Sequence, residues 1–342
     1  MSKVQRPVIS VSHYLMVDRS SSNCGRWTLD FFTRALNAIL SNMSESEKLP
    51  FNFGGLNEAM ADFGHAKVLI WPVPFEKTVS YGVGTKNGPH AIIDASRNVE
   101  LYDEEVGGET ARIGIHTLPA IDADREADEM MPALYAEAER LLKLGKFICM
   151  LGGEHSISAP VIKAHKDVYP NLSVLQIDAH ADLRDQYDGT PHSHASVMRR
   201  VLEFCPAVQV GIRSLSAEEA RVIPSLPTRV FYAKDIVGHT AWIEDAVASL
   251  TEDVYLTIDV DGFDPSLIPT TGTPEPGGLM WYDVVLLIKK AAEKKRIVGM
   301  DVTELSTAPG NNSPSFLTAK LIYKTLGYIF GDLVPKIIDA EP

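Results

Sequence analysis

The amino-acid sequence predicts an α/β fold built on a mostly parallel β-sheet. Short runs rich in β-branched residues alternate with segments in which apolar residues recur every three or four positions. This alternation is typical of βαβ units, in which a helix connects two parallel strands. The chain of 342 residues could form one large domain or two, and no linker, repeat or low-complexity tract interrupts residues 65–335. A single large domain is therefore favoured over this range.

The expected strands and helices follow one another along this range. The predicted strands are residues 67–73, 112–115, 146–151, 172–177, 207–212, 229–232, 253–258 and 296–300. The predicted helices between them are residues 124–144, 156–169, 196–204, 240–250, 281–293 and 314–330. Together they predict a sheet of about eight strands.

The first sixty residues depart from this pattern. Residues 27–39, WTLDFFTRALNAI, have the spacing of an amphipathic helix between Ser- and Glu-rich turns. Such a helix either packs on its own domain or forms an arm against a neighbouring subunit, and exposed Trp and Phe side chains would need a partner. We therefore divide the chain into an N-terminal extension, residues 1–60, which is a candidate subunit contact, and one domain, residues 61–342.

The composition excludes several classes of protein. Thirty-two Lys and Arg against 45 Asp and Glu give a net charge of −13, and the pI is near 5.2, so neither nucleic acid nor an anionic membrane is an expected partner. The three cysteines form no CxxC pair, which argues against a disulfide framework and against a thiolate zinc site. No signal peptide or spanning segment is recognised, and a cytoplasmic protein is expected.

Three segments place metal-binding side chains directly after a predicted strand. They are residues 151–156 (LGGEHS), 177–182 (IDAHAD) and 257–265 (TIDVDGFDP). In extended chain, residues i, i+2 and i+4 point to the same side, so Asp178, His180 and Asp182 can converge. Ligands of parallel α/β sheets bind beyond the carboxyl ends of the strands, and the three segments therefore predict one shared site.

The combination of these segments indicates a metal centre. Each motif alone has a structural alternative, because an Asp after a strand often caps a helix and an Asp before Pro often forms a turn. Together, however, the carboxylates would crowd the end of a buried sheet, where repulsion and desolvation are costly unless a cation binds. The six candidate ligands are His155, Asp178, His180, Asp182, Asp259 and Asp261.

The ligand types indicate which metals and which chemistry to expect. Carboxylate and imidazole ligands without thiolate favour Mn²⁺, while Ni²⁺, Co²⁺ and Fe²⁺ also fit. Six protein ligands are enough for two ions. Because neighbouring divalent ions lower the pKa of water, we expect a hydrolytic reaction.

The sequences GGEHS, DAHAD and IDVDGFDPSLIPTTGTPEPGG resemble the ureohydrolase family of arginases, agmatinases and guanidino-acid hydrolases. The resemblance covers roughly residues 65–335. It implies a three-layer α/β/α sandwich with an eight-stranded mostly parallel sheet, and release of urea from a guanidinium group. It also implies one metal held by His155, Asp178, Asp182 and Asp259, and a second held by Asp178, His180, Asp259 and Asp261.

The same resemblance implies roles for residues in the substrate pocket. His194 matches a histidine at the pocket mouth that can shuttle a proton, whereas its neighbour His192 does not match. Glu304 matches the glutamate that pairs with the substrate guanidinium, although an acid at this place could also simply begin a helix. Asp182 is expected to orient the nucleophile in addition to binding metal.

The nature of the substrate tail is less constrained. The sequences of residues 178–200 and 269–278 are more similar to those of agmatinases than to those of arginases. This similarity favours a small cationic guanidino substrate, agmatine above all. Asp185 and Asp188 would add negative potential at the entrance, whereas Arg184 could instead meet the carboxylate of guanidinobutyrate or guanidinopropionate. The sequence also resembles hydrolases that act on guanidine itself and on biguanides such as metformin, which keeps these substrates as alternatives.

Two further interpretations stay open at this stage. The chain could be a weakly catalytic partner subunit of a hetero-oligomeric ureohydrolase, although all six ligand positions are intact. It could also be a one-metal zinc amidohydrolase of the deacetylase kind, against which the pair Asp259 and Asp261 argues. The family resemblance implies a homo-oligomer, trimer or hexamer.

Overall fold

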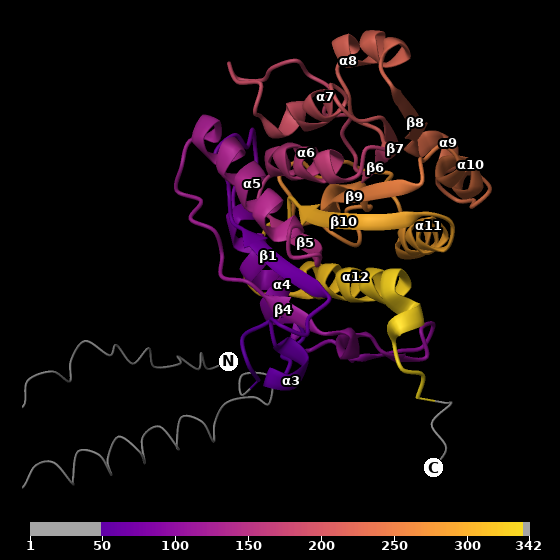
Figure 1. Cartoon of the computed structure of the whole chain (residues 1–342). Coiled ribbons are helices and arrows are strands. Elements are labelled where there is room, and N and C mark those ends of the chain that lie inside the picture. The colour runs from indigo at the N-terminus through magenta and orange to yellow at the C-terminus, as the bar shows by residue number, and fades with distance from the viewer. Residues whose placement is uncertain (1–48, 338–342) are drawn as a thin grey trace, which may run out of the picture. The chain divides into compact units, whose positions relative to one another are not determined.

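The computed structural model describes residues 49–337, which lie in one compact unit (Figure 1). Eight parallel strands form its central sheet in the order β4-β1-β5-β10-β9-β6-β7-β8. Their bounds are β1 Val68–Val73, β4 Ile115–Thr117, β5 Phe147–Gly152, β6 Leu172–Ile177, β7 Ala207–Ile212, β8 Thr228–Tyr232, β9 Asp253–Asp259 and β10 Arg296–Thr303. A separate antiparallel pair consists of β2 Tyr102–Asp103 and β3 Gly108–Glu109.

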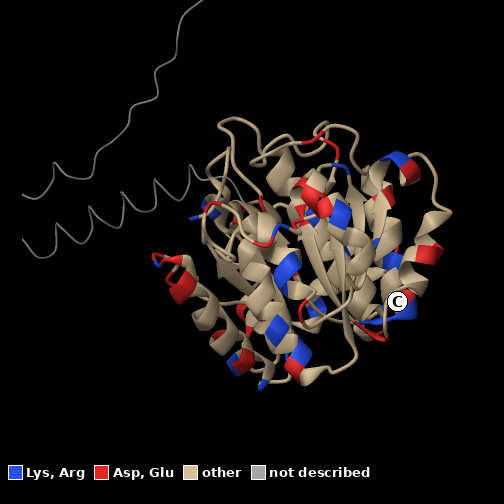
Figure 2. Ribbon diagram, turned by 90° about the horizontal axis from the view of Figure 1, so that it is seen from above, with Lys and Arg blue, Asp and Glu red and all other residues tan. Residues whose placement is uncertain are grey.

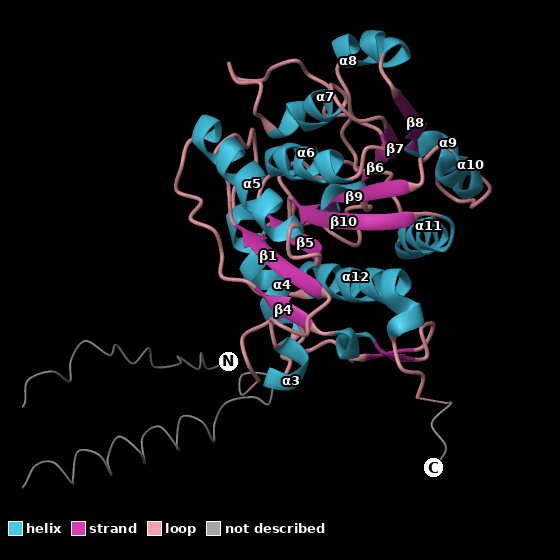
Figure 3. Ribbon diagram, viewed as in Figure 1, coloured by secondary structure: helices cyan, strands magenta, loops and turns pink. Residues whose placement is uncertain are grey.

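Helices cover both faces of this sheet (Figure 3). One layer contains α5 Ala127–Leu142, α6 Ser158–Val168 and α7 Val197–Val201. The other contains α4 Gly88–Ser96, α10 Trp242–Ala248, α11 Trp281–Lys294 and α12 Ser313–Phe330. The short helices are α3 Glu58–Ala61, α8 Ala217–Val222 and α9 Ala233–Ile236. The predicted three-layer α/β/α sandwich with a parallel eight-stranded sheet is confirmed.

The central strands are rich in apolar residues because both faces of the sheet are buried. Along β1, Val68 and Ile70 join the hydrophobic cluster on one face, whereas Leu69 and Trp71 join the cluster on the other. This is the two-residue alternation of an extended chain. Figure 2 shows the charged residues mainly on helices and loops, with the strands largely uncharged. The charges on the strands lie mostly at their ends, where the sheet meets its loops.

Some elements differ from their sequence-based predictions. The strand predicted at 112–115 was misplaced, because Thr110–Ile113 forms a 3₁₀ helix and the strand is Ile115–Thr117. Gly114 separates them at φ 81°, a conformation that glycine adopts without a Cβ clash. The helix predicted at 196–204 is shorter, Val197–Val201, and α4 was not among the helices predicted from the spacing of apolar residues.

Most of the predicted N-terminal extension, including the helix at 27–39, lies outside the described residues. Within the described part, Phe53 and Leu56 are buried in the cluster that also contains Val68. The role of residues 1–60 as a subunit contact stays a prediction. Among residues 49–337, no helix has both the length and the apolar character that crossing a membrane requires.

Candidate active site

A cavity of about 320 Å³ lies beyond the carboxyl ends of the central strands. His155 comes shortly after β5, Asp182 follows β6, Asp259 and Asp261 lie at and after the end of β9, and Glu304 follows β10. These strands are neighbours in the sheet, in the order β5-β10-β9-β6. The structure therefore brings the three predicted segments to one place.

Local backbone geometry aims these side chains into the cavity. A Cβ on Gly153 would lie 2.0 Å from the carbonyl oxygen of Phe75, so only glycine fits this turn before His155. Asp182 departs from the extended chain that the sequence pattern predicted, because its φ is 54°. This left-handed residue turns the chain, and its carboxylate still reaches His155.

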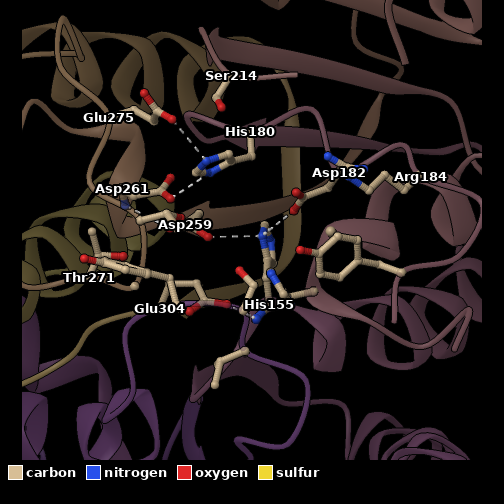
Figure 4. Close-up of a pocket in the computed structure, with 18 of the residues that line it drawn as sticks. His155, His180, Asp182, Arg184, Ser214, Asp259, Asp261, Thr271, Glu275 and Glu304 are labelled. Atoms are coloured by element: carbon tan, nitrogen blue, oxygen red, sulfur yellow. Dashed lines mark hydrogen bonds and ion pairs between the residues drawn. The ribbon is translucent and has the colours of Figure 1, made fainter. Parts of the chain in front are cut away.

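His155 lies among three carboxylates. Its Nδ1 atom is 3.2 Å from Asp178 Oδ2, 3.3 Å from Asp182 Oδ2 and 3.4 Å from Asp259 Oδ2. Figure 4 shows the ring between Asp182 and Asp259. This buried Nδ1 makes no hydrogen bond with any of residues 49–337. A nitrogen that faces three anionic oxygens without a bond requires a cation between them, either a proton or a metal ion.

A buried chain of hydrogen bonds fixes the other side of the His155 ring. Nε2 lies 2.8 Å from Thr257 Oγ1, which donates its own hydrogen to Asp301 Oδ1 at 2.6 Å. Tyr255 donates to the second oxygen of Asp301 at 2.9 Å. Because Thr257 already donates its only hydroxyl hydrogen to Asp301, its oxygen must accept a hydrogen bond from Nε2 of His155. The neutral ring then presents the lone pair of Nδ1 to the carboxylates, as a metal ligand requires.

A second group surrounds His180. Its Nδ1 atom is 2.9 Å from Asp261 Oδ2 and 3.8 Å from Asp178 Oδ1. The amide of Ala179 donates to Asp261 Oδ1 at 3.0 Å, which holds that carboxylate in place. Ligand atoms therefore converge in two groups, one of His155, Asp178 and Asp259 and one of Asp178, His180 and Asp261. Asp178 belongs to both groups.

The residues fit two divalent cations. Burial, with the nearby charges of Asp182 and Asp261, raises the pKa of Asp178 to about 7. Burial would lower the pKa of His180, but the Asp261 carboxylate outweighs it and raises that pKa to about 11. The metal-free site therefore retains protons that cations would replace. The assignment of each ligand to one of the two ions stays a prediction.

These pKa values predict how the metal-depleted protein responds to pH. A carboxyl whose folded pKa is raised from 3.8 to about 7 holds its proton more tightly when folded, so the folded state loses stability as pH rises between these values. The pKa of His180 is raised from 6.5 to about 11, so the folded state also loses stability as pH rises between these two values. Thermal unfolding after chelator treatment should give a lower Tm at about pH 8 than at about pH 5, with Mn²⁺ raising Tm more at the higher pH. A chelated protein equally stable at both would contradict this expectation.

Glu304 is buried against the first metal group. Its Oε1 accepts the backbone N–H of His155 at 2.7 Å, and its own N–H donates to Gly153 O at 2.8 Å (Figure 4). Its φ of 63° is a strained conformation for a side chain other than glycine, and such strain concentrates at functional sites. Burial and the nearby Glu154 charge raise the pKa of Glu304 well above its ordinary range. A bound cation would favour its ionised form.

His194 lies in the cavity wall, where a loop after β1 positions it. Thr78 Oγ1 accepts the N–H of His194 at 3.1 Å and lies 3.3 Å from its Nδ1. Thr78 in turn donates to Glu154, a buried carboxylate behind the loop. His192 does not line the cavity and lies 3.9 Å from Asp128. Of the two histidines, His194 alone lines the cavity, and its catalytic role stays a prediction.

Other cavity residues were not recognised, or were placed differently, by sequence reasoning. Asp185 is 72% exposed and pairs with Arg200 at 2.7 Å, so its charge is largely compensated outside the cavity. Arg184 lines the cavity and stacks over the Tyr187 ring. The Thr271 hydroxyl lines the cavity without a hydrogen-bond partner among the described residues. Thr271 lies within the family-like stretch 269–278, but no local pattern revealed the Thr257 and Asp301 relay.

Comparison with known proteins identifies the family. The Arginase family matches residues 66–327 of the chain. The chain belongs to the arginase family. It is 40% identical over 281 residues to an N(1)-aminopropylagmatine ureohydrolase of Synechocystis sp., covering 80% of the chain and 92% of that protein. It is 35% identical over 274 residues to an agmatinase of Pyrococcus horikoshii, covering 78% and 93%. This family membership confirms the predicted ureohydrolase resemblance.

Solved structures agree with the arginase-family fold. The agmatine ureohydrolase of Thermoplasma volcanium superposes with a TM-score of 0.75 and 28% identity, covering 87% of this chain and 98% of that one. As a member of the arginase family, the chain is a hydrolase that acts on guanidino C–N bonds. Its two groups of ligand atoms fit the binuclear divalent metal centre of such an enzyme.

Proposed function

We propose that this ureohydrolase cleaves a guanidino compound with a positively charged tail, giving urea and an amine. Agmatine and N(1)-aminopropylagmatine are the proposed substrates. The charge of the cavity carries the proposal, because Arg184 is the only Lys or Arg among its described lining residues. The acidic lining residues are Asp182, Glu219, Asp259, Asp261, Glu275 and Glu304. Asp182, Asp259 and Asp261 are proposed metal ligands and Glu304 is proposed to bind the guanidinium, which leaves Glu219 and Glu275 to favour a cationic tail over a carboxylate tail.

The proposed roles follow from the positions of the side chains. Glu304 binds the guanidinium, whose two parallel N–H groups match a carboxylate. Asp182, beside the first metal group, accepts a proton from the attacking water and orients it. His194, held by Thr78, delivers a proton to the leaving amine. Two bound divalent cations supply a water of lowered pKa and positive charge that offsets the charge developing in hydrolysis.

We propose Mn²⁺ as the physiological metal, with Ni²⁺ as the alternative. The ligands are carboxylates and imidazoles, a mixture that Mn²⁺ accepts, and no thiolate is within the two groups. The proposed ligands are His155, Asp178, His180, Asp182, Asp259 and Asp261. Two groups that share Asp178 favour this reading over a one-metal amidohydrolase, and the complete ligand set argues against a non-catalytic partner subunit.

The proposal extends to assembly and location. The family resemblance supports a homo-oligomer, trimer or hexamer, with a hetero-oligomer as the alternative. Tyr282 and Leu286 of α11 and Phe316 of α12 are exposed apolar side chains that a subunit contact could cover. Cys149 and Cys205 are free and buried, which is compatible with a reducing, cytoplasmic location.

A second candidate is a guanidino-acid hydrolase. Arg184 favours it, because this guanidinium lines the cavity and makes no ion pair within residues 49–337. It could bind the carboxylate of guanidinobutyrate or guanidinopropionate. Guanidine and biguanides such as metformin are smaller alternatives that need no group for a charged tail.

Urea release by the purified full-length chain tests the proposal. The protein is stripped of metal, loaded separately with Mn²⁺ and Ni²⁺, and assayed with agmatine, N(1)-aminopropylagmatine, arginine, guanidinobutyrate, guanidinopropionate, guanidine and metformin. We expect the two polyamine-like substrates to exceed the carboxylate-bearing ones by at least about 100-fold in kcat/KM, since a charge in the wrong place is strongly rejected. Fastest turnover of guanidinobutyrate would favour the second candidate. Absence of urea from every compound would count against both.

A further inference from the structure

We infer that Glu219 binds the ammonium group of the substrate tail and thereby determines specificity for cationic guanidino compounds. This inference rests on the proposed function and names the residue that would recognise the charged tail of the substrate. Glu219 is the third residue of α8 and is only 4% exposed, yet it lines the same cavity as Glu304 and the metal groups.

The Glu219 carboxylate is held in the wall between two loops. Its Oε1 accepts the N–H of Leu183 at 2.9 Å, and its Oε2 accepts the N–H of Ser216 at 2.7 Å. Leu183 directly follows Asp182, whose carboxylate contacts His155. Glu219 is therefore hydrogen-bonded to the residue that follows Asp182, and it lines the cavity into which a tail extending from the guanidinium would run.

The charge of Glu219 is incompletely compensated. A carboxylate can accept about four hydrogen bonds, and Glu219 accepts two from residues 49–337, with no ion pair to any of their Lys, Arg or His side chains. Glu154 is the matched case: equally buried, it accepts from Lys77 N, Thr78 N, Thr78 Oγ1 and Ser156 Oγ. Burying a charge is costly unless it is paired, and the remaining capacity of Glu219 suits an ammonium donor.

Other acidic residues near the cavity are less suited to this task. Asp185 is already paired with Arg200 outside the cavity. Glu275 Oε1 lies 3.9 Å from Nε2 of His180, one of the metal-group histidines (Figure 4). Glu219 also forms a capping box with Ser216 at the start of α8. The cap explains its contact with Ser216, but it does not require the negative charge to face the cavity.

A pair of substrates isolates the ammonium group. n-Pentylguanidine has the shape of agmatine with a methyl group in place of the ammonium. For the metal-loaded wild-type protein we expect kcat/KM for agmatine to exceed that for pentylguanidine by about 10- to 100-fold, the range for a hydrogen bond to a charged group. Glu219→Gln should remove most of this preference, lowering kcat/KM for agmatine by about 10-fold or more beyond any change in kcat/KM for pentylguanidine.

The control variant separates recognition from helix capping. Ser216→Ala removes the hydroxyl that accepts the Glu219 N–H at 3.2 Å but keeps the carboxylate, so it should preserve the agmatine preference. Glu219→Asp keeps the charge and should retain part of it. Equal losses for both substrates in Glu219→Gln, or loss of the preference in Ser216→Ala, would show a merely structural role and overturn the inference.

Calorimetric binding of the same two compounds gives a readout that does not depend on turnover. Wild-type protein should bind agmatine more tightly than pentylguanidine by about 10-fold or more, and Glu219→Gln should bind the two alike. Absence of this preference in the wild-type protein overturns the inference even if urea is released. Preferential binding of agmatine without urea release from any compound would support the role of Glu219 while the proposed function fails.

Discussion

Glu304→Gln is expected to abolish most turnover while leaving both metal ions in place. The amide keeps an oxygen that can accept the N–H of His155, now 2.7 Å from Glu304 Oε1, so the strained backbone at this position keeps its anchor. What is lost is the negative charge and one of the two parallel acceptors for the guanidinium. Removing one partner of a buried charge pair costs about 2–5 kcal/mol, so kcat/KM should fall by at least about 30-fold, and by about 400-fold in the middle of that range.

Metal content and steady-state kinetics decide whether Glu304 acts on the substrate. Its variant should hold as much Mn²⁺ per chain as the wild-type protein and should unfold at a similar temperature. The affinity for a substrate-like guanidinium compound should weaken in parallel with kcat/KM. Turnover within about threefold of wild type would assign Glu304 to the alternative role, an acidic residue that only stabilises the backbone after β10.

The fold was predictable where burial leaves a continuous signal. Strands β6 and β7 were predicted with their observed bounds, because residues between two helical layers must be apolar on both faces. The helix Gly88–Ser96 was not among the helices predicted from apolar spacing, and its Gly-Pro start is compatible with a turn as well as with the first turn of a helix. Local pattern could not distinguish the two outcomes, since tertiary packing decides between them.

The metal-binding candidates were predictable for a different reason. Their residue types are costly to bury together, and their positions after strands place them at one edge of a parallel sheet. Hydrogen-bond and ion-pair partners that are distant in sequence could not be predicted from a local sequence pattern. The pairing of Asp185 with Arg200 and the contact of Glu219 with Leu183 join segments 15 and 36 residues apart, so charge near a motif was a poor guide to charge in the cavity. The Thr257 and Asp301 relay also joins two strands distant in sequence.

Replacing Asp178 is expected to remove both metal ions, because this carboxylate belongs to both groups of ligand atoms. Its Oδ2 faces Nδ1 of His155 at 3.2 Å, and its Oδ1 faces Nδ1 of His180 at 3.8 Å. In Asp178→Ala, each group of ligand atoms loses an anionic ligand that it shares with the other group. The metal content measured after gel filtration should fall from about two ions per chain to near zero, and urea release should be lost.

The two histidines separate the groups. His155 contributes only to the first group and His180 only to the second, so each Ala variant should lose one ion preferentially and release urea at least about 100-fold more slowly. His192→Ala is the matched control, since His192 is a neighbour of the cavity that contributes to neither group and should keep both ions. Unchanged metal occupancy in His155→Ala would contradict the ligand assignment. Loss of only one ion from Asp178→Ala would indicate that Asp259 is the shared ligand instead; it lies at the end of β9, and its Oδ1 accepts the N–H of Asp261.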